Sequence, residues 1–463
     1  MQRMSGIDAG MFFAENETTP LQIASVSVFE GPAPTYGEFI RAVVARLVRL
    51  PRFRQRVRRV PLDLGRPVWI DDPHFQLLYH VRHTAVPAPG GAEELRNLAG
   101  RVLAHRLDLS RPLWETWLVE GLMADQWAII SKVHHCMVDG VGGSDLMTSL
   151  FDLGPEVPAA QARHAEIPLP EVEHQPSRPA LALGGLIDTT AEQVRQVARL
   201  PWVARDSTDA ATGRFVRGLP GYARRIFSGR GAPSLNGPTS PHRRWSWTQA
   251  DLTEARRISA AFGGTVNDVV LAAVARGFRD LLAGRDVLEA DTVVRTMVPV
   301  SVRMPDERGT LTNRLSGVIV ILPCGEPDPV TRLRLVREQS EGLKAGRQAA
   351  GPEILTTMLG LAPNFLAVAA HAALRIRQPL IHTITTNVPG PAVPLYAMGR
   401  RLTAIYPYVP LAAGIRVSTG LVSYLDTLYF GVTGDFDAMP DLEVLAGGIR
   451  QGFDELAKAA ARV

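Results

Sequence analysis

Two adjacent histidines stand at the end of an apolar stretch, in the string Lys132-Val133-His134-His135-Cys136-Met137-Val138-Asp139-Gly140. Neighbouring side chains of a strand point to opposite faces, so His134 and His135 cannot both face one pocket unless the backbone bends between them. One of them at most is catalytic. A neutral imidazole, with a reference pKa of about 6.5, is a suitable general base near pH 7 and can take a proton from a hydroxyl. Asp139 could orient that histidine or anchor the turn, and Gly140 permits a tight backbone path.

Two other interpretations of the string remain open. Histidine and aspartate are metal ligands, but adjacent histidines on a strand diverge and no third ligand follows at helical spacing, so we predict no metal. A structural turn without chemistry is the second alternative. The chain has no Gly-x-Ser-x-Gly, no Gly-x-Gly-x-x-Gly and no P-loop pattern, which removes the usual sequence signs of serine hydrolases, dinucleotide sites and ATP sites.

The elements expected around this string are a mixture of strands and helices throughout the chain. Strands are expected at Leu21–Phe29, Gln126–His135, Thr292–Val300, Leu315–Leu322 and Leu380–Thr386, with paired strands within Leu421–Gly434. Helices are expected at Glu38–Leu50, Glu93–Arg106, Ser144–Phe151, Leu181–Asp206, Thr248–Phe262, Val266–Leu282, Val330–Arg347 and Leu442–Ala461.

A length of 463 residues suggests two or three domains, or one large unit with two lobes. Six prolines lie between Gly154 and Ala180, where they oppose regular ladders and favour an extended tether. We therefore predict an N-terminal lobe over residues 1–153, a proline-rich crossover with a helix over 154–241, and a C-terminal lobe over 242–463.

Composition excludes several classes of function. Hydrophobic residues make up 46% and charged residues 21% of the chain, as in globular proteins. A net charge of +4 without a recognisable binding module gives no reason to expect a nucleic-acid partner. The two cysteines, Cys136 and Cys324, support neither a disulfide framework nor a cysteine-based zinc site, and they favour a reducing compartment. The N-terminus lacks the pattern of a secretory signal.

Two stretches suit contact with a lipid surface. Ile354–Leu374 has no charged residue and is about long enough to span a bilayer, but Gly360 and Pro363 interrupt it. We favour two buried helical pieces there, with an interfacial surface as the alternative. Arg41–Arg59 holds eight arginines and no acidic residue. It is either a solvated face or a site for an anionic partner such as coenzyme phosphates or acidic lipid headgroups.

The spacing His135-x-x-x-Asp139-Gly140 resembles the active-site signature of the coenzyme-A-dependent acyltransferases with the chloramphenicol-acetyltransferase-like fold. With its doubled histidine, the string is similar to that of the bacterial wax ester synthase/diacylglycerol acyltransferase family. Further blocks that match this family, in family order, are Ser5–Phe12, Pro67–Asp72, Arg111–Glu115, Asn267-Asp268, Val298–Arg303 and Asn387–Pro391. The resemblance implies two similar α/β lobes, each with a mixed sheet flanked by helices, and an active-site channel at their interface.

The resemblance also implies the reaction and the roles in the motif. An acyl group would move from acyl-CoA, a co-substrate, to the hydroxyl of diacylglycerol or a long-chain alcohol, with no permanently bound cofactor. The family spacing makes His135 the general base, because His134 comes one residue too early. Asp139 is expected to form a structural ion pair with Arg303, and Gly140 to meet a backbone requirement.

Three more elements take roles by the same resemblance. The amide of Asn267 is expected to stabilise the tetrahedral oxyanion, although a helix N-cap is an alternative, since Asn is a favoured cap and Thr265 lies nearby. Pro112, Leu113 and Trp114 are expected to form the scaffold of the channel wall, as is the block that begins at Asn387.

A second class of function stays open, a catalytically weak lipid-binding or droplet-coating protein of the same fold. The intact His135, Asp139 and Asn267 favour an enzyme. Because the substrates implied by the resemblance are greasy, we expect a cytoplasmic protein in peripheral contact with the inner membrane face or with lipid droplets.

Overall fold

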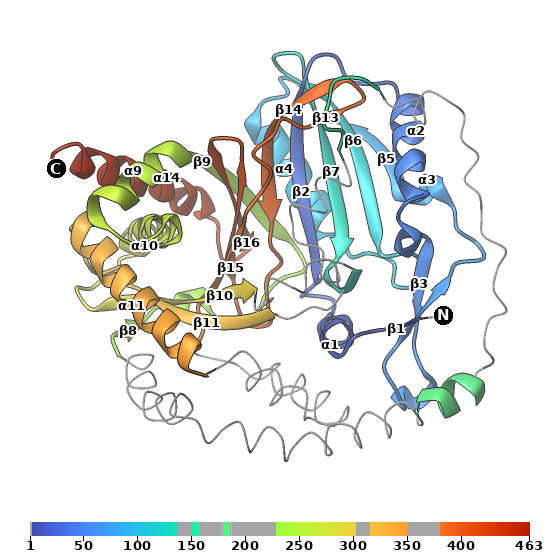
Figure 1. Cartoon of the computed structure of the whole chain (residues 1–463), viewed down its shortest axis with the longest axis horizontal. Coiled ribbons are helices and arrows are strands. Elements are labelled where there is room, and N and C mark those ends of the chain that lie inside the picture. The colour runs from blue at the N-terminus through green and yellow to red at the C-terminus, as the bar shows by residue number, and fades with distance from the viewer. Residues whose placement is uncertain are drawn as a thin grey trace.

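The computed structural model describes residues 2–137, 151–157, 179–185, 228–301, 315–350 and 380–463, together with Ser177 and Ile187. Within these ranges the chain forms two lobes that lie side by side, each built on a β-sheet with helices packed against it (Figure 1). The predicted α/β class with mixed sheets is confirmed. A small sheet in the order β1 (Gln2–Arg3), β4 (Val68–Asp71) and β3 (Gln55–Arg58) flanks the N-terminal lobe.

The sheet of the N-terminal lobe has the order β13-β14-β2-β7-β6-β5. Its strands are β2 (Gln22–Glu30), β5 (Val81–Ala85), β6 (Trp114–Leu122), β7 (Gln126–His134), β13 (Tyr396–Ala397) and β14 (Arg400–Tyr408). The central strand β7 is antiparallel to both β2 and β6. Trp127, Ala128 and Ile130 of β7 are fully buried, as expected for a strand that is covered on both faces. This rigid strand carries the two histidines at its end.

Short helices surround that sheet. They are α1 (Gly6–Ala14), α2 (Tyr36–Leu47), α3 (Leu77–His80) and α4 (Ala92–Ala104), with the 3-10 helices η1 (Pro51–Arg54), η2 (Pro61–Asp63) and η3 (His135–Met137). The helix α1 was not among those predicted from the sequence. Ser5 caps it, because the Ser5 hydroxyl accepts the N–H of Asp8 at 3.2 Å. The same helix packs against η3, directly beside the histidines.

The sheet of the C-terminal lobe has the order β11-β10-β12-β15-β16-β9, with β8 (Arg230–Gly231) paired to β10. The other strands are β9 (Arg243–Asp251), β10 (Thr292–Ser301), β11 (Leu315–Leu322), β12 (Thr383–Val388), β15 (Val417–Tyr424) and β16 (Thr427–Asp435). The helices of this lobe are η4 (Pro233–Leu235), α9 (Leu252–Phe262), α10 (Val266–Gly284), α11 (Pro329–Ala350) and α14 (Leu442–Ala460).

The helix α10 is the core helix of this lobe, and α14 packs closely on it. A Cβ atom added at Gly448 of α14 would lie 2.8 Å from the Cα of Gly277 in α10. The two helix backbones therefore meet where neither residue has a side chain. This packing buries most of α10 and fixes the position of its N-terminal turn.

The strand β14 joins the two lobes, because it comes from the C-terminal part of the chain and pairs with β2 in the N-terminal sheet. Its other contacts reach β16, where the Tyr429 hydroxyl donates to the Thr403 carbonyl at 2.9 Å. Gly431 of β16 lies so close that a Cβ there would overlap the carbonyl oxygen of Pro407. The two lobes are thus joined where the backbones of β14 and β16 are in direct contact.

Most of the predicted elements are found, and one is wrong in part. The helix predicted over Thr248–Phe262 begins only at Leu252, because residues 248–251 complete β9 and Asp251 caps α9. The helix predicted over 144–151 lies outside the described residues except for its last residue. Most of the helix predicted over 181–206, and all of the stretch 354–374, lie outside them too. The lobe and crossover boundaries at 153 and 241 stay a prediction.

Candidate active site

The two histidines lie where β7 ends and η3 begins. The His134 side chain is fully buried, whereas His135 is half-buried. The backbone N–H of His134 donates to the Leu113 carbonyl, and that of His135 donates to the Leu21 carbonyl, both at 2.9 Å. Residues next to β6 and β2 therefore hold the backbone of the motif.

Protein atoms occupy both ring nitrogens of His134. Its Nδ1 accepts the backbone N–H of Cys136 at 3.1 Å and lies 3.0 Å from the Cys136 Sγ. Burial raises the pKa of the Cys136 thiol well above its usual range, and the charges of Asp8 and Glu15 add to the shift, so the sulfur also keeps its proton. Because Nδ1 faces donors, the ring proton is assigned to Nε2.

That Nε2 lies 2.8 Å from Oε2 of Glu15, the residue that follows α1. The buried ring thus faces a charged acceptor at short distance. Oε1 of Glu15 accepts Arg106 Nε at 2.9 Å, and Oε2 also accepts the Leu21 N–H at 3.3 Å. Burial would raise the pKa of Glu15, but the contacts with His134, Arg106 and Leu21 outweigh it and leave the pKa lowered. Glu15 is thus a buried carboxylate.

His135 has the properties of a neutral base. Burial lowers the pKa of its imidazole, with the backbone carbonyl of His135 itself opposing the shift, His134 adding to it and the Asp8 carboxylate opposing it. Within the described ranges, its buried Nδ1 makes no well-aligned hydrogen bond. A histidine with a lowered pKa is unprotonated at neutral pH and can accept a proton.

Pro112, Leu113 and Trp114 support the strand end from the other side. Leu113 is fully buried, and its carbonyl takes the N–H of His134. The Trp114 ring stacks on His80 with centroids 4.7 Å apart, and its Nε1 donates to the Phe53 carbonyl at 2.7 Å. These contacts suit the scaffold role expected from the sequence.

Asn267 lies in the first turn of α10, and the structure changes one interpretation of it. Thr265 is the N-cap, and the Asp268 carboxylate accepts both its N–H at 2.7 Å and its hydroxyl at 2.8 Å. The alternative that Asn267 caps the helix is therefore wrong. Its Oδ1 instead accepts Nδ2 of Asn387, near the end of β12, at 3.1 Å. Within the described residues no hydrogen bond joins this amide pair to the histidines.

Three of the predicted site residues, Asp139, Gly140 and Arg303, lie outside the described residues. The ion pair between Asp139 and Arg303 therefore stays a prediction. Sequence reasoning also missed Glu15 and Asp8, the two buried carboxylates at the ends of α1. A buried second histidine requires a polar partner, but nothing in the sequence points to Glu15 as that partner.

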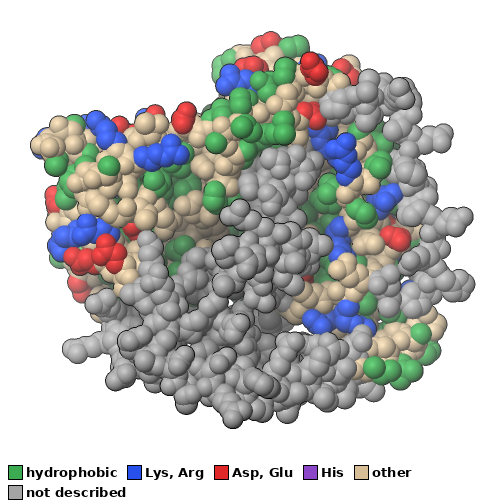
Figure 2. All heavy atoms as spheres, in the orientation of Figure 1, with side chains coloured by type: hydrophobic (Ala, Val, Ile, Leu, Met, Phe, Trp, Pro, Cys, Tyr) green, Lys and Arg blue, Asp and Glu red, His purple; other side chains and the backbone are tan. Residues whose placement is uncertain are grey.

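The arginine-rich stretch 41–59 is partly engaged within the protein. Its ion pairs with acidic residues outside the stretch include Arg46–Asp152 (3.1 Å), Arg56–Asp72 (3.9 Å) and Arg59–Asp63 (2.6 Å). On the face shown in Figure 2, basic and acidic side chains are interspersed. Part of the stretch therefore has a structural role.

In the described parts of the chain, no group of three or more His, Cys, Asp or Glu side chains is arranged to hold a metal ion. In the same ranges no single helix has the length and apolar composition of a bilayer span. The helices α9 and α10 meet both criteria only when taken together, and the chain bends by 101° between them.

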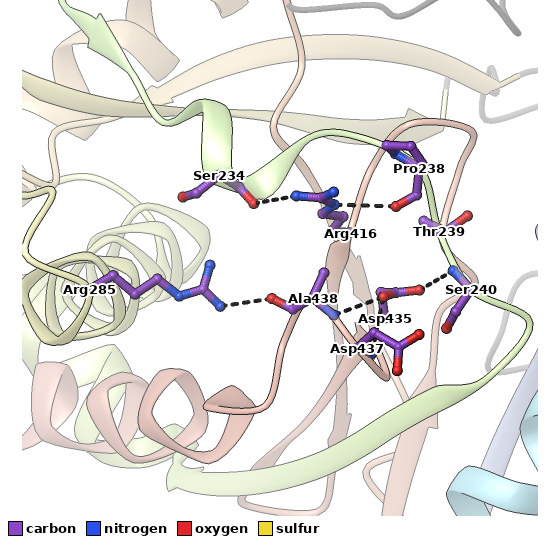
Figure 3. Close-up of a pocket in the computed structure, with 9 residues that line it drawn as sticks. All are labelled: Ser234, Pro238, Thr239, Ser240, Arg285, Arg416, Asp435, Asp437 and Ala438. Carbon is purple, nitrogen blue, oxygen red and sulfur yellow. Dashed lines mark hydrogen bonds between the residues drawn. The ribbon is translucent and has the colours of Figure 1, made fainter.

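An open cavity of about 570 Å³, lined mostly by polar residues, lies on the C-terminal lobe (Figure 3). Arg416 on its wall donates to the carbonyls of Ser234 and Pro238, both at 3.3 Å. Arg285 donates to Asp441 at 2.5 Å and to the carbonyl of Ala438 at 3.1 Å. Since both arginines serve the surrounding loops, we assign no ligand to this cavity.

The fold is that of the two-lobed acyltransferases. The chain resembles the solved wax ester synthase/diacylglycerol acyltransferase from Marinobacter aquaeolei VT8, with 24% identity, a TM-score of 0.66 and coverage of 99% of this chain and 100% of the other. It also resembles the trichothecene 15-O-acetyltransferase from Fusarium sporotrichioides, with 14% identity, a TM-score of 0.62 and coverage of 98% and 94%. The two-lobed fold predicted from the resemblance is thereby confirmed.

Family models cover most of the sequence. Residues 4–270 match the wax ester synthase/diacylglycerol acyltransferase catalytic domain, and residues 311–457 match the C-terminal domain of the same family. The probable diacylglycerol O-acyltransferase Tgs1 of Mycobacterium tuberculosis is 35% identical over 465 residues, which cover 100% of this chain and 97% of that protein. The chain belongs to the wax ester synthase/diacylglycerol acyltransferase family, and it is an acyltransferase.

Proposed function

We propose that the protein transfers a fatty acyl group from acyl-CoA to the hydroxyl of diacylglycerol or of a long-chain alcohol, with His135 as the general base. The observation that carries this role is the position of a half-buried His135 directly after β7, in a chain of this family, and the lowered pKa of its imidazole is consistent with it. The relatives named as diacylglycerol O-acyltransferases favour an enzyme over a lipid-binding protein.

In the proposed reaction both substrates are bound together and no acyl-enzyme forms. His135 takes the proton of the acceptor hydroxyl while that oxygen attacks the thioester carbonyl. The tetrahedral intermediate then expels the CoA thiolate, which receives the same proton from His135. The products are the ester and free CoA, and no redox step or permanently bound cofactor is needed.

Three residues assist in this scheme. Asn267 Nδ2 donates a hydrogen bond to the oxyanion, a role supported by its place in the first turn of α10, where the helix dipole is positive. Asp139 and Arg303 form the ion pair that anchors the turn after the histidines. Acyl-CoA binds only as a substrate; a starter condensation domain with this type of fold has been solved with C8-CoA.

We infer a cytoplasmic location with peripheral contact to the inner membrane face or to lipid droplets. The support is chemical, since diacylglycerol and long-chain alcohols partition into lipid. Arginines of the stretch 41–59 would add attraction to anionic headgroups. Flotation of the purified protein with vesicles of anionic and of neutral lipid tests this location; no binding to either would contradict it.

The catalytic proposal is tested by transfer of radiolabelled acyl-CoA to diacylglycerol and to hexadecanol. Wild-type protein is expected to form labelled ester, and His135→Ala to lose about 10²- to 10⁴-fold in rate while its melting temperature stays close to that of wild type. An unchanged rate in His135→Ala would refute the base role. No product from wild type with either acceptor would support the lipid-binding alternative.

A further inference from the structure

The buried Glu15 and His134 have no part in the proton transfer, yet they form a closed circuit around His135. Glu15 Oε2 accepts the Leu21 N–H at 3.3 Å, and the Leu21 carbonyl accepts the His135 N–H at 2.9 Å. His134, bonded covalently to His135, returns to the same Oε2 at 2.8 Å. One carboxylate oxygen of Glu15 thus contacts both the Leu21 backbone, which binds the His135 N–H, and the ring of His134, the residue before His135.

The His134 ring also closes the turn on the other side of His135. Its Nδ1 accepts the Cys136 N–H at 3.1 Å, so the residues before and after His135 are linked through one imidazole. The exposed fractions of the His134 and Glu15 side chains are 0% and 1%. Water therefore cannot replace either contact, and a lost partner would leave a buried polar group unsatisfied.

The geometry requires one tautomer of His134. The Cys136 N–H occupies Nδ1, so only the Nε2–H form can donate to Glu15. The other tautomer would place a ring N–H against the Cys136 N–H and a bare nitrogen against the carboxylate, which are two unfavourable contacts. Glu15 thereby selects the tautomer that holds the turn.

We propose that Glu15 and His134 act as one unit, a pair of positioning residues that sets the place and direction of the His135 ring. The inference rests on the proposed function, in which His135 is the base. It gives the first histidine of the doubled motif a purpose distinct from the chemistry of the second. It also assigns a role to the carboxylate at the end of α1, which is far from the motif in sequence.

A double-mutant cycle tests whether the two residues act as one unit. Because a misplacement of about 1 Å can cost about 10²-fold, we expect Glu15→Ala and His134→Ala each to lower kcat about 10²-fold with little change in KM. The double variant should be no slower than the slower single variant. Losses that multiply in the double variant would overturn the proposal.

Loss of folded protein must be separated from loss of position. A displaced base makes proton transfer slower, so the solvent deuterium isotope effect on kcat should rise in Glu15→Ala, whereas a smaller folded fraction leaves that ratio unchanged. An unchanged isotope effect would overturn the proposal. The matched control is Glu455→Ala in the C-terminal lobe, which removes the carboxylate 3.0 Å from the buried Arg332. This control should lose stability and keep the wild-type isotope effect.

The isosteric variant Glu15→Gln keeps the test valid if Glu15→Ala does not fold. Its amide oxygen can still accept from His134 and Leu21, while its NH₂ group opposes Arg106. We expect Glu15→Gln to lose less kcat than His134→Ala. An equal loss would mean that the negative charge of Glu15, and not its contact with His134, is what matters, and would overturn the positioning role. If His135→Ala remains active, the proposed function fails. If His135→Ala is inactive while Glu15→Gln and His134→Ala both keep the wild-type kcat, only the positioning role of Glu15 and His134 is refuted.

Discussion

Asn387 holds the side-chain amide of Asn267 in one of its two orientations, and the substitution Asn387→Asp should reverse it. At present Asn387 Nδ2 donates to Asn267 Oδ1 at 3.1 Å, which leaves Nδ2 of Asn267 available to donate elsewhere. An aspartate has only acceptor oxygens. It would attract Nδ2 of Asn267, rotate the amide by half a turn and present Oδ1 where the oxyanion needs a donor.

The expected magnitude differs between two substitutions at this position. One lost oxyanion donor costs about 2.7–4 kcal/mol, so Asn387→Asp should lower kcat about 10²- to 10³-fold, as should Asn267→Ala. Asn387→Ala removes the orienting contact without reversing it. If both orientations are then equally populated, half of the molecules stay competent and kcat falls only about twofold.

The assay compares acyl transfer to hexadecanol by the three variants, with their melting temperatures. Asn387 is exposed, so its substitutions should change the stability by no more than about 0.5 kcal/mol. Asn97→Asp on the exposed face of α4 is the control that adds the same charge. Equal rates for Asn387→Asp and Asn387→Ala would refute the orientation argument, and a normal rate for Asn267→Ala would refute the donor role itself.

Three further predictions concern stability. If Asp139 forms the proposed ion pair with Arg303, Asp139→Asn should lower both the melting temperature and the activity, because removing one member of a buried ion pair costs about 3–5 kcal/mol; full activity with unchanged melting would contradict this. Burial, and then the charge of Arg295, lower the pKa of His382 to about 4, so the folded state binds fewer protons than the unfolded state. The contribution of His382 to the free energy of unfolding is complete above about pH 6.5 and falls by about 3 kcal/mol as the pH drops to 4. When the free energy of unfolding is measured in urea at pH 7 and pH 4.5, His382→Gln should therefore lose less stability between the two pH values than wild type does. Gly431→Ala should unfold the junction or melt far below wild type, since its Cβ would overlap the Pro407 carbonyl; near-normal melting would show that β14 can move away.

Local patterns in the sequence predicted the elements whose periodicity is unbroken. The strand over Leu315–Leu322 has the predicted bounds, and α10 and α14 differ from theirs by one or two residues. The start of α9 was misplaced because residues 248–251 fit a helix as well as the end of a strand. The place of β14 in the N-terminal sheet could not be predicted, since it depends on pairing with β2 across most of the chain.

The candidate site shows the same division between local and distant information. His135 and Asn267 are predicted from the resemblance to the family motifs. The purpose of His134 does not, because it depends on Glu15, which is more than a hundred positions away and reads as an ordinary surface acid next to a short helix. Likewise, the capping of α10 by Thr265 and the contact with Asn387 became visible only in three dimensions.

The place of β14 has a consequence for synthesis of the chain on the ribosome. When residue 134 has been translated, β2 and β7 can already pair, but the outer edge of β2 has no partner until β14 is made. At about 5–20 residues per second, the nascent chain waits roughly 15–55 s for that strand. An unpaired strand edge is prone to associate with other chains, so chaperone binding during translation should concentrate in this interval.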